Sequence, residues 1–563
     1  MNPNNKWTQY LLVALIGAIF FLPYLGAVHL FDWDEINFAE AAREMIVTGD
    51  YLTVRINYEP FHEKPPLFIW MQAASMHAFG INEFAARLPN AIIGIMSLLA
   101  VFTIGRRLFD YKFGFLWVLA WLGSFLPHFY FKSGIIDPTF NLFIFGGIYY
   151  LYKYYDARLN HPAADKRIYR SLIWGGVMCS LAILTKGPVG YLLTFIAWMI
   201  FWFMNRKRVK FPFMELAIFT AIAVLLPLVW YGVNMARLGS DLVTLFIDYH
   251  MRLLTTGDAG HSGPIYYHFV VLLFGCFPAS VIALRGFRLQ PEDIYSQRDF
   301  KRWMVILLSV VLIIFSVVET KIVHYSSLAY FPITFLAAYA MYGLAFRSVR
   351  WKASTAWLLG IIGFLMGAAL ALLPLVLMNV EMILPKVTDK FTNALLRTDA
   401  GWLGFEYMIG IVYIIALAIA LLLFYKRMPL RGFFVMFGAS AIVLFTFLPL
   451  IAPRIEAYTQ RANIEFYRNL QGCDCYVMAL DHKSYAQYFY TRRPPELSEN
   501  NLPIPKDEFK DWLLEGDIDR PAYFIVRNKG YEKYLEFPGV EEMYSKNGFV
   551  FLMRPAVENN PAE

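Results

Sequence analysis

Thirteen long apolar segments recur along the chain and decide what it can fold into. A helix that crosses a bilayer needs about 20 mostly apolar residues. Hydrophobic residues make up 58% of the chain and charged residues only 17%, against about 45–50% and about 25% in soluble domains. The sequence therefore predicts a polytopic α-helical membrane protein, and it excludes an ordinary cytosolic enzyme and a disordered chain.

The predicted spans, some of them short, cover residues 9–31, 87–108, 113–131, 135–152, 171–185, 188–204, 213–233, 266–284, 303–319, 323–345, 356–379, 403–425 and 432–451. The first is not expected to be a cleaved signal peptide, because its apolar run exceeds 20 residues and no small-residue cleavage site closes it.

Basic residues gather in every second loop between these spans. Together with Lys6, these short loops hold 24 of the 50 lysines and arginines. Because short cytoplasmic loops carry the excess of basic residues, we expect this set to face the cytoplasm. The N-terminus is then cytoplasmic, and the odd number of spans places the C-terminus outside.

Three larger pieces fall on the outer side, namely residues 32–86, residues 234–265 and the tail from residue 452. We predict a transmembrane domain over residues 1–451 and a small soluble α/β domain over residues 452–563. In the tail, Ala522–Val526 and Gly548–Leu552 are typical of strands. The chain has no Asn-x-Ser/Thr sequon, which fits a bacterial protein slightly better than a secretory-pathway protein.

Charged residues at a membrane surface are costly and are therefore functional candidates. Asp32, Asp34 and Glu35 follow the first span, at the start of a helical pattern that also carries Arg43. They could cap the helix, but three acids within four residues exceed what one cap needs. We predict that Asp34 is catalytic and that Glu35 and Arg43 bind substrate.

Two further outer positions carry charge next to proline. Glu63 and Lys64 precede Pro65-Pro66 and an apolar run. A lysine at a helix N-terminus predicts a phosphate site, with a lysine that only marks the interface as the alternative. Asp137 precedes Pro138 at the outer end of a span. It is predicted to be catalytic, with a simple helix cap as the alternative.

Two later outer segments add cations and histidines. The 234–265 loop contains His250, Arg252 and His261. Arg252 is a candidate for phosphate binding, and the histidines with Glu63 could hold Zn²⁺ or Mg²⁺ or could be ordinary surface histidines. Lys321 and Tyr325 close a span on the same side, as phosphate ligands or as interfacial anchors.

Acids, lysines and aromatic residues gathered at one outer face fit chemistry on a lipid phosphate. Transfer of a sugar from a polyprenyl phosphate needs cations that stabilise the negative charge developing on the leaving phosphate. A hydroxyl acceptor also needs a base, for which a carboxylate such as Asp34 is suited. A phosphate acceptor would need none.

Four motifs occur in order on this side: Asp32–Arg43, Glu63–Pro66, Asn82–Pro89 and Asp137. In these motifs the chain resembles the GT-C glycosyltransferases related to the 4-amino-4-deoxy-L-arabinose lipid A transferase and the dolichyl-phosphate-mannose protein mannosyltransferases. The resemblance covers about the first 330 residues. The thirteen-span layout with an outer C-terminal domain is similar to the aminoarabinose transferase in particular.

The resemblance implies roles for individual residues. Asp34 matches the essential carboxylate after the first span, and Asp137 matches the second acidic residue near the active site. Glu63 matches a metal-associated glutamate and Lys64 a lysine that binds the carrier phosphate. The remaining matches are His250, with His261 as a competitor, Arg252, and the Lys321…Tyr325 element.

We therefore expect an inverting glycosyltransferase of the bacterial inner membrane that takes a sugar from a polyprenyl-phosphate donor. The acceptor is lipid A or another envelope glycolipid at the periplasmic face, and the partners are membrane lipids rather than nucleic acid. The transfer is either metal-assisted, with Zn²⁺ or Mg²⁺, or metal-independent, and no other cofactor is expected. The rival in the same class is a protein O-mannosyltransferase, and the rival of another class is a transporter or lipid flippase. A purely structural envelope protein is the third alternative. Against transport, the charged residues gather on one face rather than at the bilayer midplane.

Overall fold

The computed structural model describes residues 5–160, 165–239, 241–255, 262–347 and 349–557. All thirteen predicted spans fall on helices or helix pairs. These are α1 (Lys6–Phe21), α4 (Glu83–Leu108), α5 (Tyr111–Leu122) with α6 (Phe125–Phe129), α7 (Asp137–Asn160), α8 (Asp165–Lys186), α9 (Val189–Asn205), α10 (Phe213–Leu238), α12 (Tyr267–Gly275) with α13 (Ala279–Gly286), α14 (Tyr295–Val317), η3 (Val323–Ala329) with α15 (Tyr330–Phe346), α16 (Ala353–Met378), α18 (Met408–Tyr425) and α19 (Pro429–Leu450).

Eight of the described helical segments are long and apolar enough to cross a membrane, and ten are if each bent pair is one span. The two pairs bend by 88° after Leu122 and by 106° after Gly275. Gly123-Ser124 and Phe277-Pro278 lie at these breaks, where glycine flexibility and the missing proline N–H interrupt a helix. Helices α1 and α9 are apolar but shorter. The chain is therefore a multi-pass helical membrane protein.

The first predicted span is too long at its C-terminal end. Helix α1 stops at Phe21 rather than near residue 31, and Pro23 follows at once. The Arg87 guanidinium of α4 donates hydrogen bonds to three carbonyl oxygens of the segment that follows α1, those of Leu25, Val28 and His29, at 2.6–2.9 Å. An arginine side chain thus replaces the helical hydrogen bonds that this apolar segment would otherwise make.

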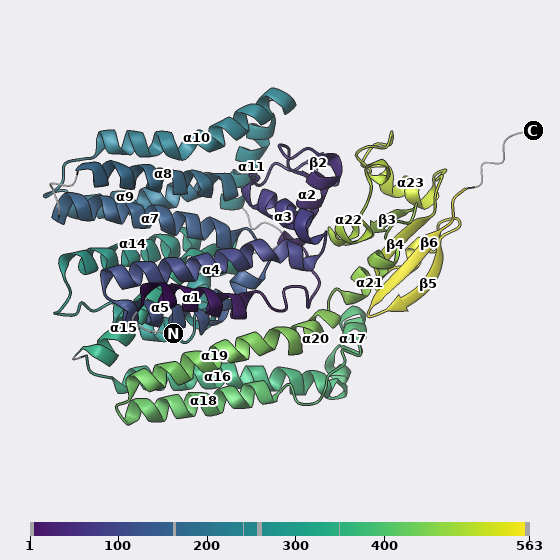
Figure 1. Cartoon of the computed structure of the whole chain (residues 1–563). Coiled ribbons are helices and arrows are strands. Elements are labelled where there is room, and N and C mark those ends of the chain that lie inside the picture. The colour runs from purple at the N-terminus through teal and green to yellow at the C-terminus, as the bar shows by residue number, and fades with distance from the viewer. Residues whose placement is uncertain (1–4, 161–164, 240, 256–261, 348, 558–563) are drawn as a thin grey trace, which may run out of the picture.

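Between α1 and α4 lie α2 (Asp34–Thr48), the short hairpin of β1 (Arg55–Ile56) and β2 (Glu59–Pro60), and α3 (Leu67–Phe79). Helix α11 (Asp241–Thr255) follows α10. In Figure 1 these elements form a layer at one end of the long helices, and the termini of α16 and α19 reach the same end.

The tail folds into a four-stranded sheet with the order β3-β4-β6-β5. Its strands are β3 (Tyr476–Ala479), β4 (Ala522–Arg527), β5 (Glu541–Lys546) and β6 (Phe549–Arg554). β3 pairs with β4 in parallel, and the other pairs are antiparallel. The predicted strands thus correspond to β4 and β6. Short helices connect the tail to the bundle and to the sheet: α17 (Lys390–Leu396), α20 (Ala452–Ala457), α21 (Arg461–Asn469), α22 (Ala486–Thr491) and α23 (Phe509–Glu515).

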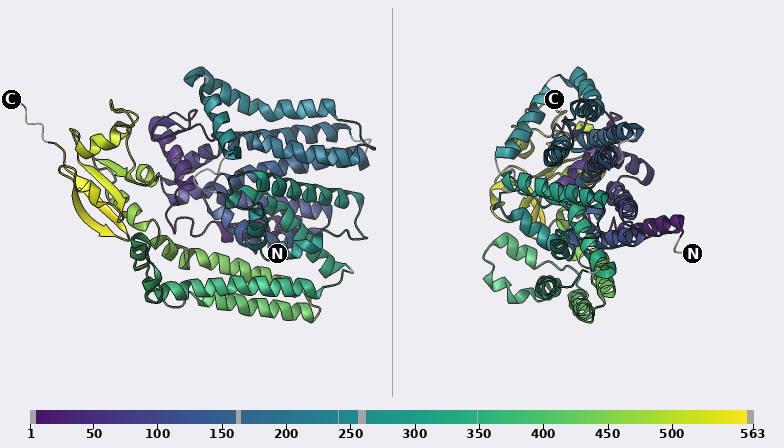
Figure 2. Two further views of the ribbon diagram at one scale, coloured as in Figure 1. Left: turned by 180° about the vertical axis from the view of Figure 1, so that it is seen from behind. Right: turned by 90° about the vertical axis from the view of Figure 1, so that its left-hand side faces the viewer.

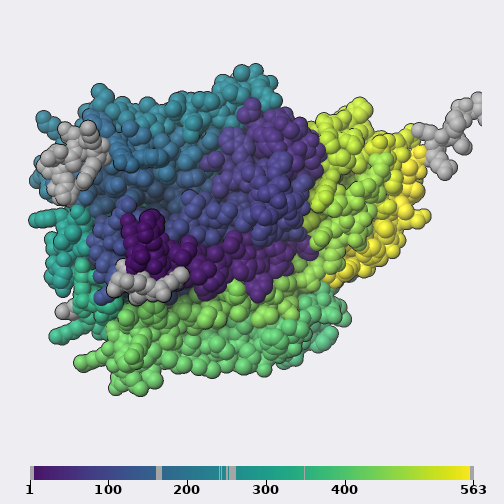
Figure 3. All heavy atoms as spheres, in the orientation of Figure 1, coloured from purple at the N-terminus to yellow at the C-terminus, as the bar shows by residue number. Residues whose placement is uncertain are grey.

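The sheet domain packs directly on the layer that contains α2 and α3. One buried hydrophobic cluster joins Ile36 and Met45 of α2 to Ile464 of α21, Tyr490 of α22 and Phe551 of β6. Figure 2 shows the sheet beyond this layer in the view from behind, and Figure 3 shows the two surfaces in continuous contact. The outer layer and the sheet domain are therefore held together by a shared core.

Helix α2 is buried from its second residue along most of its length, including Glu35, Glu40, Arg43 and Glu44. The Arg43 guanidinium binds both carboxylate oxygens of Glu40, at 2.7 and 2.6 Å, and the carbonyl oxygen of Arg493 at 3.0 Å. Burial and the nearby Glu40 carboxylate raise the pKa of Glu44. Arg43 is predicted to bind substrate, but the residue is 1% exposed and its N–H groups donate to these contacts. Arg43 therefore joins α2 to the sheet domain instead.

The raised pKa of Glu44 predicts a pH-dependent stability. The folded protein holds a proton on Glu44 that the unfolded chain releases near pH 4.3, so this contribution to stability falls as pH rises from that value through the folded-state pKa. In Glu44→Gln the melting temperature should vary less between pH 5 and 8 than in the wild type, measured by thermal unfolding in detergent. The exposed Glu536→Gln is the control, and parallel curves for wild type and Glu44→Gln would contradict the assignment.

Candidate active site

Four polar side chains from four elements meet at the end of the helix bundle that carries the outer layer. Asp34 is the first residue of α2, Asp137 the first of α7, Lys186 the last of α8, and His324 lies in η3. His324 Nε2 lies 3.4 Å from Asp34 Oδ2 and 3.7 Å from Asp137 Oδ2. Lys186 Nζ donates to Asp137 Oδ1 at 2.6 Å. We refer to these residues as the Asp–Lys–His cluster.

The members of this cluster differ in exposure. The Asp137 side chain is 4% exposed, whereas that of Asp34 is 39% exposed, with Lys186 and His324 at 18% and 20%. Lys186 compensates the buried charge of Asp137, as a buried carboxylate requires. Asp34 is therefore the carboxylate of the cluster that a substrate can reach.

The turn before α7 places Asp137. Asn90 of α4 donates its side-chain amide to the carbonyl oxygens of Ser133 and Ile135, at 2.7 and 2.6 Å. The hydroxyl of Tyr130 donates to the carbonyl oxygen of Asp137 at 2.9 Å. These three hydrogen bonds around one turn leave Asp137 little freedom, which is what a catalytic carboxylate needs.

Glu35, the neighbour of Asp34, links the turn before α7 to α2. Glu35 accepts two hydrogen bonds from Arg87, at 3.0 and 2.7 Å, one from the N–H of Phe31 at 2.9 Å and one from the N–H of Gly134. Burial raises the pKa of Glu35, but the Arg87 charge and these hydrogen bonds outweigh it, so the pKa is lowered. Glu35 was predicted to bind substrate; its buried carboxylate is occupied by this ion pair, so it positions Asp34 and Asp137.

A buried polar network supports the η3 side of the site. The Asn141 amide donates to the hydroxyls of Tyr130 and Ser327, at 2.8 and 2.7 Å, and Ser327 donates in turn to the carbonyl oxygen of His324. Lys186 Nζ also lies 5.1 Å from the ring centroid of Tyr325. The predicted residue Tyr325 is thus at the site, through Lys186.

The predicted phosphate lysine Lys64 lies in an adjoining part of the outer layer. Its Nζ is 3.6 Å from the Glu63 carboxylate and its side chain is 11% exposed. Lys64 lines a crevice together with His62, Trp230 and Tyr231. The crevice is bounded by the outer loop, α10 and Phe246 of α11, and Lys64 is the one lysine or arginine among its described lining residues.

Lys321 is placed differently from the prediction. Its Nζ is buried and donates to the carbonyl oxygens of Phe315 and Ser316, at 3.1 and 2.8 Å, and to that of Val318. The last carbonyl groups of α14 have no N–H partners within the helix, and the Lys321 ammonium group donates hydrogen bonds to them. Lys321 therefore caps α14 and is not directed at a phosphate.

The predicted metal ligands do not form a group that the structure describes. His261 lies outside the described residues, and so does the side chain of His250, whose backbone belongs to α11. Within the described part of the chain, no three His, Cys, Asp or Glu side chains converge as metal ligands. Glu63 faces Lys64. Arg252 is an exposed residue of α11.

The sheet domain contacts the residues just before Asp34. Asp32 accepts hydrogen bonds from the Ser484 hydroxyl at 2.5 Å and from the N–H of Tyr485 at 3.2 Å. Lys483 lies over the ring of Trp33, 5.2 Å from its centroid. Burial raises the pKa of Asp32, against the smaller effect of these hydrogen bonds. The sheet domain thus fixes the backbone two residues from Asp34.

Sequence reasoning missed two members of the cluster. Lys186 follows an apolar run and His324 precedes one, and neither has a charged neighbour within two residues, so they look like interfacial anchors. Their partners Asp137 and Asp34 are 49 and 290 residues away. The available signal was position: Lys186 directly follows the predicted span 171–185 and His324 lies at the start of the predicted span 323–345, both on the side where Asp34 and Asp137 lie.

Comparison with known proteins agrees with this fold. A family model described as dolichyl-phosphate-mannose-protein mannosyltransferase matches residues 63–231. The undecaprenyl phosphate-alpha-4-amino-4-deoxy-L-arabinose arabinosyl transferase of Pectobacterium atrosepticum is 26% identical over 385 residues, or 66% of each chain. The enzyme of the same name from Edwardsiella ictaluri is 26% identical over 49% of each chain. The chain thus spans about half to two thirds of these relatives' length.

Solved structures share more of the chain. The crystal structure of ArnT from Cupriavidus metallidurans bound to undecaprenyl phosphate covers 99% of this chain and 100% of its own, with 18% identity and a TM-score of 0.78. The oligosaccharyltransferase AglB from Archaeoglobus fulgidus covers 94% of this chain and 70% of its own, with 10% identity and a TM-score of 0.51. The predicted resemblance is confirmed: in sequence and in fold, this chain is similar to the GT-C glycosyltransferases related to aminoarabinose transferases and protein mannosyltransferases.

Proposed function

We propose that the chain is an inverting glycosyltransferase that moves a sugar from a polyprenyl-phosphate donor to lipid A or another envelope glycolipid. The observation that carries this proposal is the Asp–Lys–His cluster, in which an accessible carboxylate stands beside a buried, charge-compensated one. The names of the sequence relatives, which specify an undecaprenyl-phosphate aminoarabinose donor, support the same reaction.

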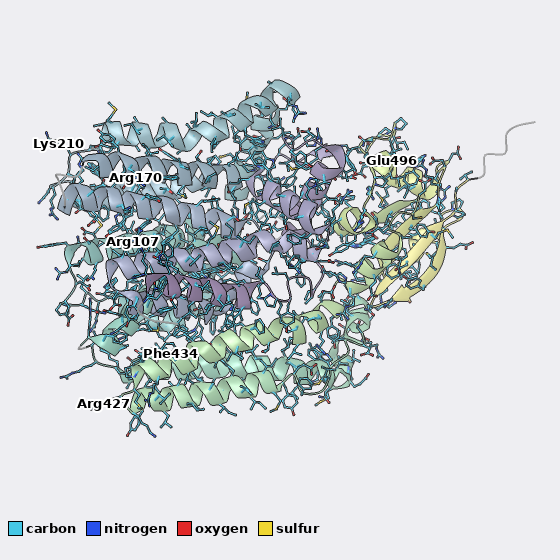
Figure 4. All side chains as sticks on the ribbon, viewed as in Figure 1. Arg107, Arg170, Lys210, Arg427, Phe434 and Glu496 are labelled. Atoms are coloured by element: carbon cyan, nitrogen blue, oxygen red, sulfur yellow. The ribbon has the colours of Figure 1, made fainter. Side chains whose placement is uncertain are left out.

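The orientation in the membrane follows from the distribution of charge. In Figure 4, Arg107, Arg170, Lys210 and Arg427 lie at one end of the bundle, and Glu496 of the sheet domain lies at the other. We propose that the basic end is cytoplasmic and that the thirteen helical segments cross the inner membrane of a bacterium. The Asp–Lys–His cluster and the domain of residues 452–563 then face the periplasm.

The proposed reaction is a single displacement. An acceptor oxygen attacks the anomeric carbon of the donor sugar, the new C–O bond forms, and the bond between that carbon and the carrier phosphate breaks with both electrons leaving on the phosphate. When the acceptor is a hydroxyl, Asp34 takes its proton. His324, between Asp34 and Asp137, orients the Asp34 carboxylate, and Lys186 balances the charge of Asp137.

The leaving phosphate needs cations. We assign this role to Lys64 and Arg252, which lie on the outer loop and on α11. Tyr325 lies beside Lys186 of the Asp–Lys–His cluster. No step of this mechanism is assigned to Glu63, His250 or His261.

Two lysines that look alike in sequence should respond differently to removal of their charge. Lys64→Met is expected to raise the KM for the donor about tenfold or more, because a charge-assisted contact to the phosphate is lost. Lys321→Met should instead lower the melting temperature, since it uncaps α14. Kinetics against donor concentration and thermal unfolding of both variants measure this, and an equal rise in donor KM for both would contradict it.

The contact between the sheet domain and Asp32 should affect catalysis. Ser484→Ala is expected to lower kcat about tenfold with little change in donor KM, because loss of the Ser484 hydrogen bond to Asp32 leaves the Asp34 carboxylate less well placed. Ser484→Thr, which keeps the hydroxyl, should recover much of the rate. A loss of rate that follows the melting temperature alone, with no rescue by threonine, would argue for a purely structural contact.

Protein O-mannosyl transfer is the second candidate, and the family-model match over residues 63–231 is the observation that favours it. Transport is disfavoured because the cluster lies at one end of the bundle, where α2, α7 and η3 meet, rather than at its middle.

The test of the reaction class uses the purified full-length protein. It is incubated in detergent with an undecaprenyl-phosphate-linked aminoarabinose and lipid A, and the products are identified by mass spectrometry. Acceptor-dependent release of undecaprenyl phosphate with a matching gain in lipid A mass is the expected result. No turnover with lipid A, but transfer to protein from a polyprenyl-phosphate mannose, would favour the second candidate.

A further inference from the structure

Two cavities meet at the basic end of the molecule, far from the Asp–Lys–His cluster. One is an apolar groove along the first turns of α16 and the last turns of α18, where Trp357, Phe364 and Leu421 line it. The other contains Arg350 and Arg427. Trp351 lines both. Their volumes are about 1010 and 1110 Å³ when the space open to the surroundings is included.

The chain is strongly basic around the second cavity. The segments 347–352 and 426–431 contain six lysines and arginines and no acidic residue. Arg347 is paired with Asp293 at 2.6 Å, but Arg350 and Arg427 are exposed. Figure 4 places Arg427 at the end of the bundle opposite the sheet domain. A cavity of this charge at a membrane surface complements a phosphate headgroup.

The residues between the two cavities are held in place by ring stacking and by a hydrogen bond. The Trp351 ring stacks on Phe424 with centroids 4.3 Å apart and an angle of 21°, and Phe424 packs on Phe433 of α19 at 5.0 Å. Arg285 donates to the carbonyl oxygen of Arg350 at 2.9 Å, which holds this loop in place. Tryptophan is the residue typical of the boundary between headgroups and hydrocarbon.

From this arrangement we infer that the paired cavities bind one anionic diacyl phospholipid of the surrounding membrane. Its phosphate lies between Arg350 and Arg427, and one acyl chain lies in the groove between α16 and α18. The order of the parts matches the ligand, since the charged cavity lies at the bundle end and the apolar groove continues from Trp351 along the helices. This site is separate from the proposed transfer site.

The test is native mass spectrometry of the full chain in mild detergent, titrated with dioleoyl phosphatidylglycerol or dioleoyl phosphatidylcholine. The phosphatidylglycerol is expected to bind about tenfold more tightly, since each basic residue near a headgroup contributes appreciably. Arg350→Gln with Arg427→Gln should abolish this preference. The matched control is Lys207→Gln with Lys210→Gln, an exposed pair at the same end with the same loss of charge, and it should keep the preference.

A second variant tests the apolar groove. Gly360 lines it, and the nearest atom to an added Cβ is Leu421 Cδ1 at 3.5 Å, which is an ordinary van der Waals contact. Gly360→Leu should fill the groove and weaken phosphatidylglycerol binding severalfold, with the melting temperature of the lipid-free protein unchanged. Equal affinity for the two lipids, or equal losses in the arginine and lysine double variants, would overturn the inference. Because no sugar donor is used, either result is independent of the transferase activity.

Discussion

Replacing Asp34 with asparagine is expected to slow sugar transfer about 10³-fold, within the range by which a positioned general base accelerates a reaction. The substitution keeps the size of the side chain and removes the carboxylate that accepts the acceptor's proton. Affinity for the donor should change little, because Lys64 and Arg252 rather than Asp34 bind the phosphate in the proposed mechanism. Single-turnover kinetics with a hydroxyl acceptor, together with a donor-binding titration, measure both quantities.

The control for this prediction is Asp507→Asn, which makes the same change at an exposed position of the sheet domain. It should leave the rate unaltered. If Asp34→Asn retained more than about a tenth of the wild-type rate, the carboxylate could orient the sugar but would not be the base. If it lost donor binding instead, the division of roles between Asp34 and the cations would be incorrect.

Among the substitutions proposed for this protein, replacing Arg87 should cause the largest loss of folding stability. Arg87→Met leaves the Glu35 carboxylate buried without its counter-ion, and breaking a buried ion pair from one side costs about 3–5 kcal/mol. It also leaves the carbonyl groups of Leu25, Val28 and His29 without their donor. The expected result is a large fall in melting temperature and in the yield of folded protein from the membrane.

The double variant Arg87→Met with Glu35→Gln separates charge from packing. Because the double variant removes the buried Glu35 carboxylate that has lost its counter-ion, it should be more stable than Arg87→Met alone, as measured by thermal unfolding at equal detergent concentration. Arg302→Met is the control: its partner is Asp299 at 2.9 Å, but its side chain is 45% exposed, and such pairs contribute about 1 kcal/mol or less. If Arg87→Met and Arg302→Met were equally stable, the Glu35–Arg87 pair would not hold the turn before α7.

Much of the architecture follows from the sequence because membrane spans depend on local composition. Every predicted span lies on a helix or a bent pair, and the predicted strands Ala522–Val526 and Gly548–Leu552 correspond to β4 and β6. The C-terminal end of α1 could not be predicted from local composition, because the apolar residues after Phe21 are hydrogen-bonded by Arg87, which is 62 residues away from Leu25 in the chain. A side chain that replaces helical hydrogen bonds leaves no local trace.

The site was accessible to sequence reasoning only in part. Asp34 and Asp137 stand out because charge beside an apolar span is costly, and the structure brings them together through His324. Lys321 stood out for the same reason, yet it caps α14. Lys186, a lysine in a similar setting, pairs with Asp137. Which lysine faces the site depends on how α7, α8 and α14 pack, and a linear sequence does not contain that information.

The most direct test of the account is mass spectrometry of whole-envelope lipids and glycoproteins from a bacterial strain that lacks its own copy of this chain. The strain is supplied with either the wild-type chain or Asp34→Asn at matched expression. The account predicts that one glycolipid species carries an extra sugar mass with the wild type and loses it with Asp34→Asn. Identical envelopes in the two strains, with the wild type active, would contradict it, and a sugar mass lost from protein instead would favour O-mannosyl transfer.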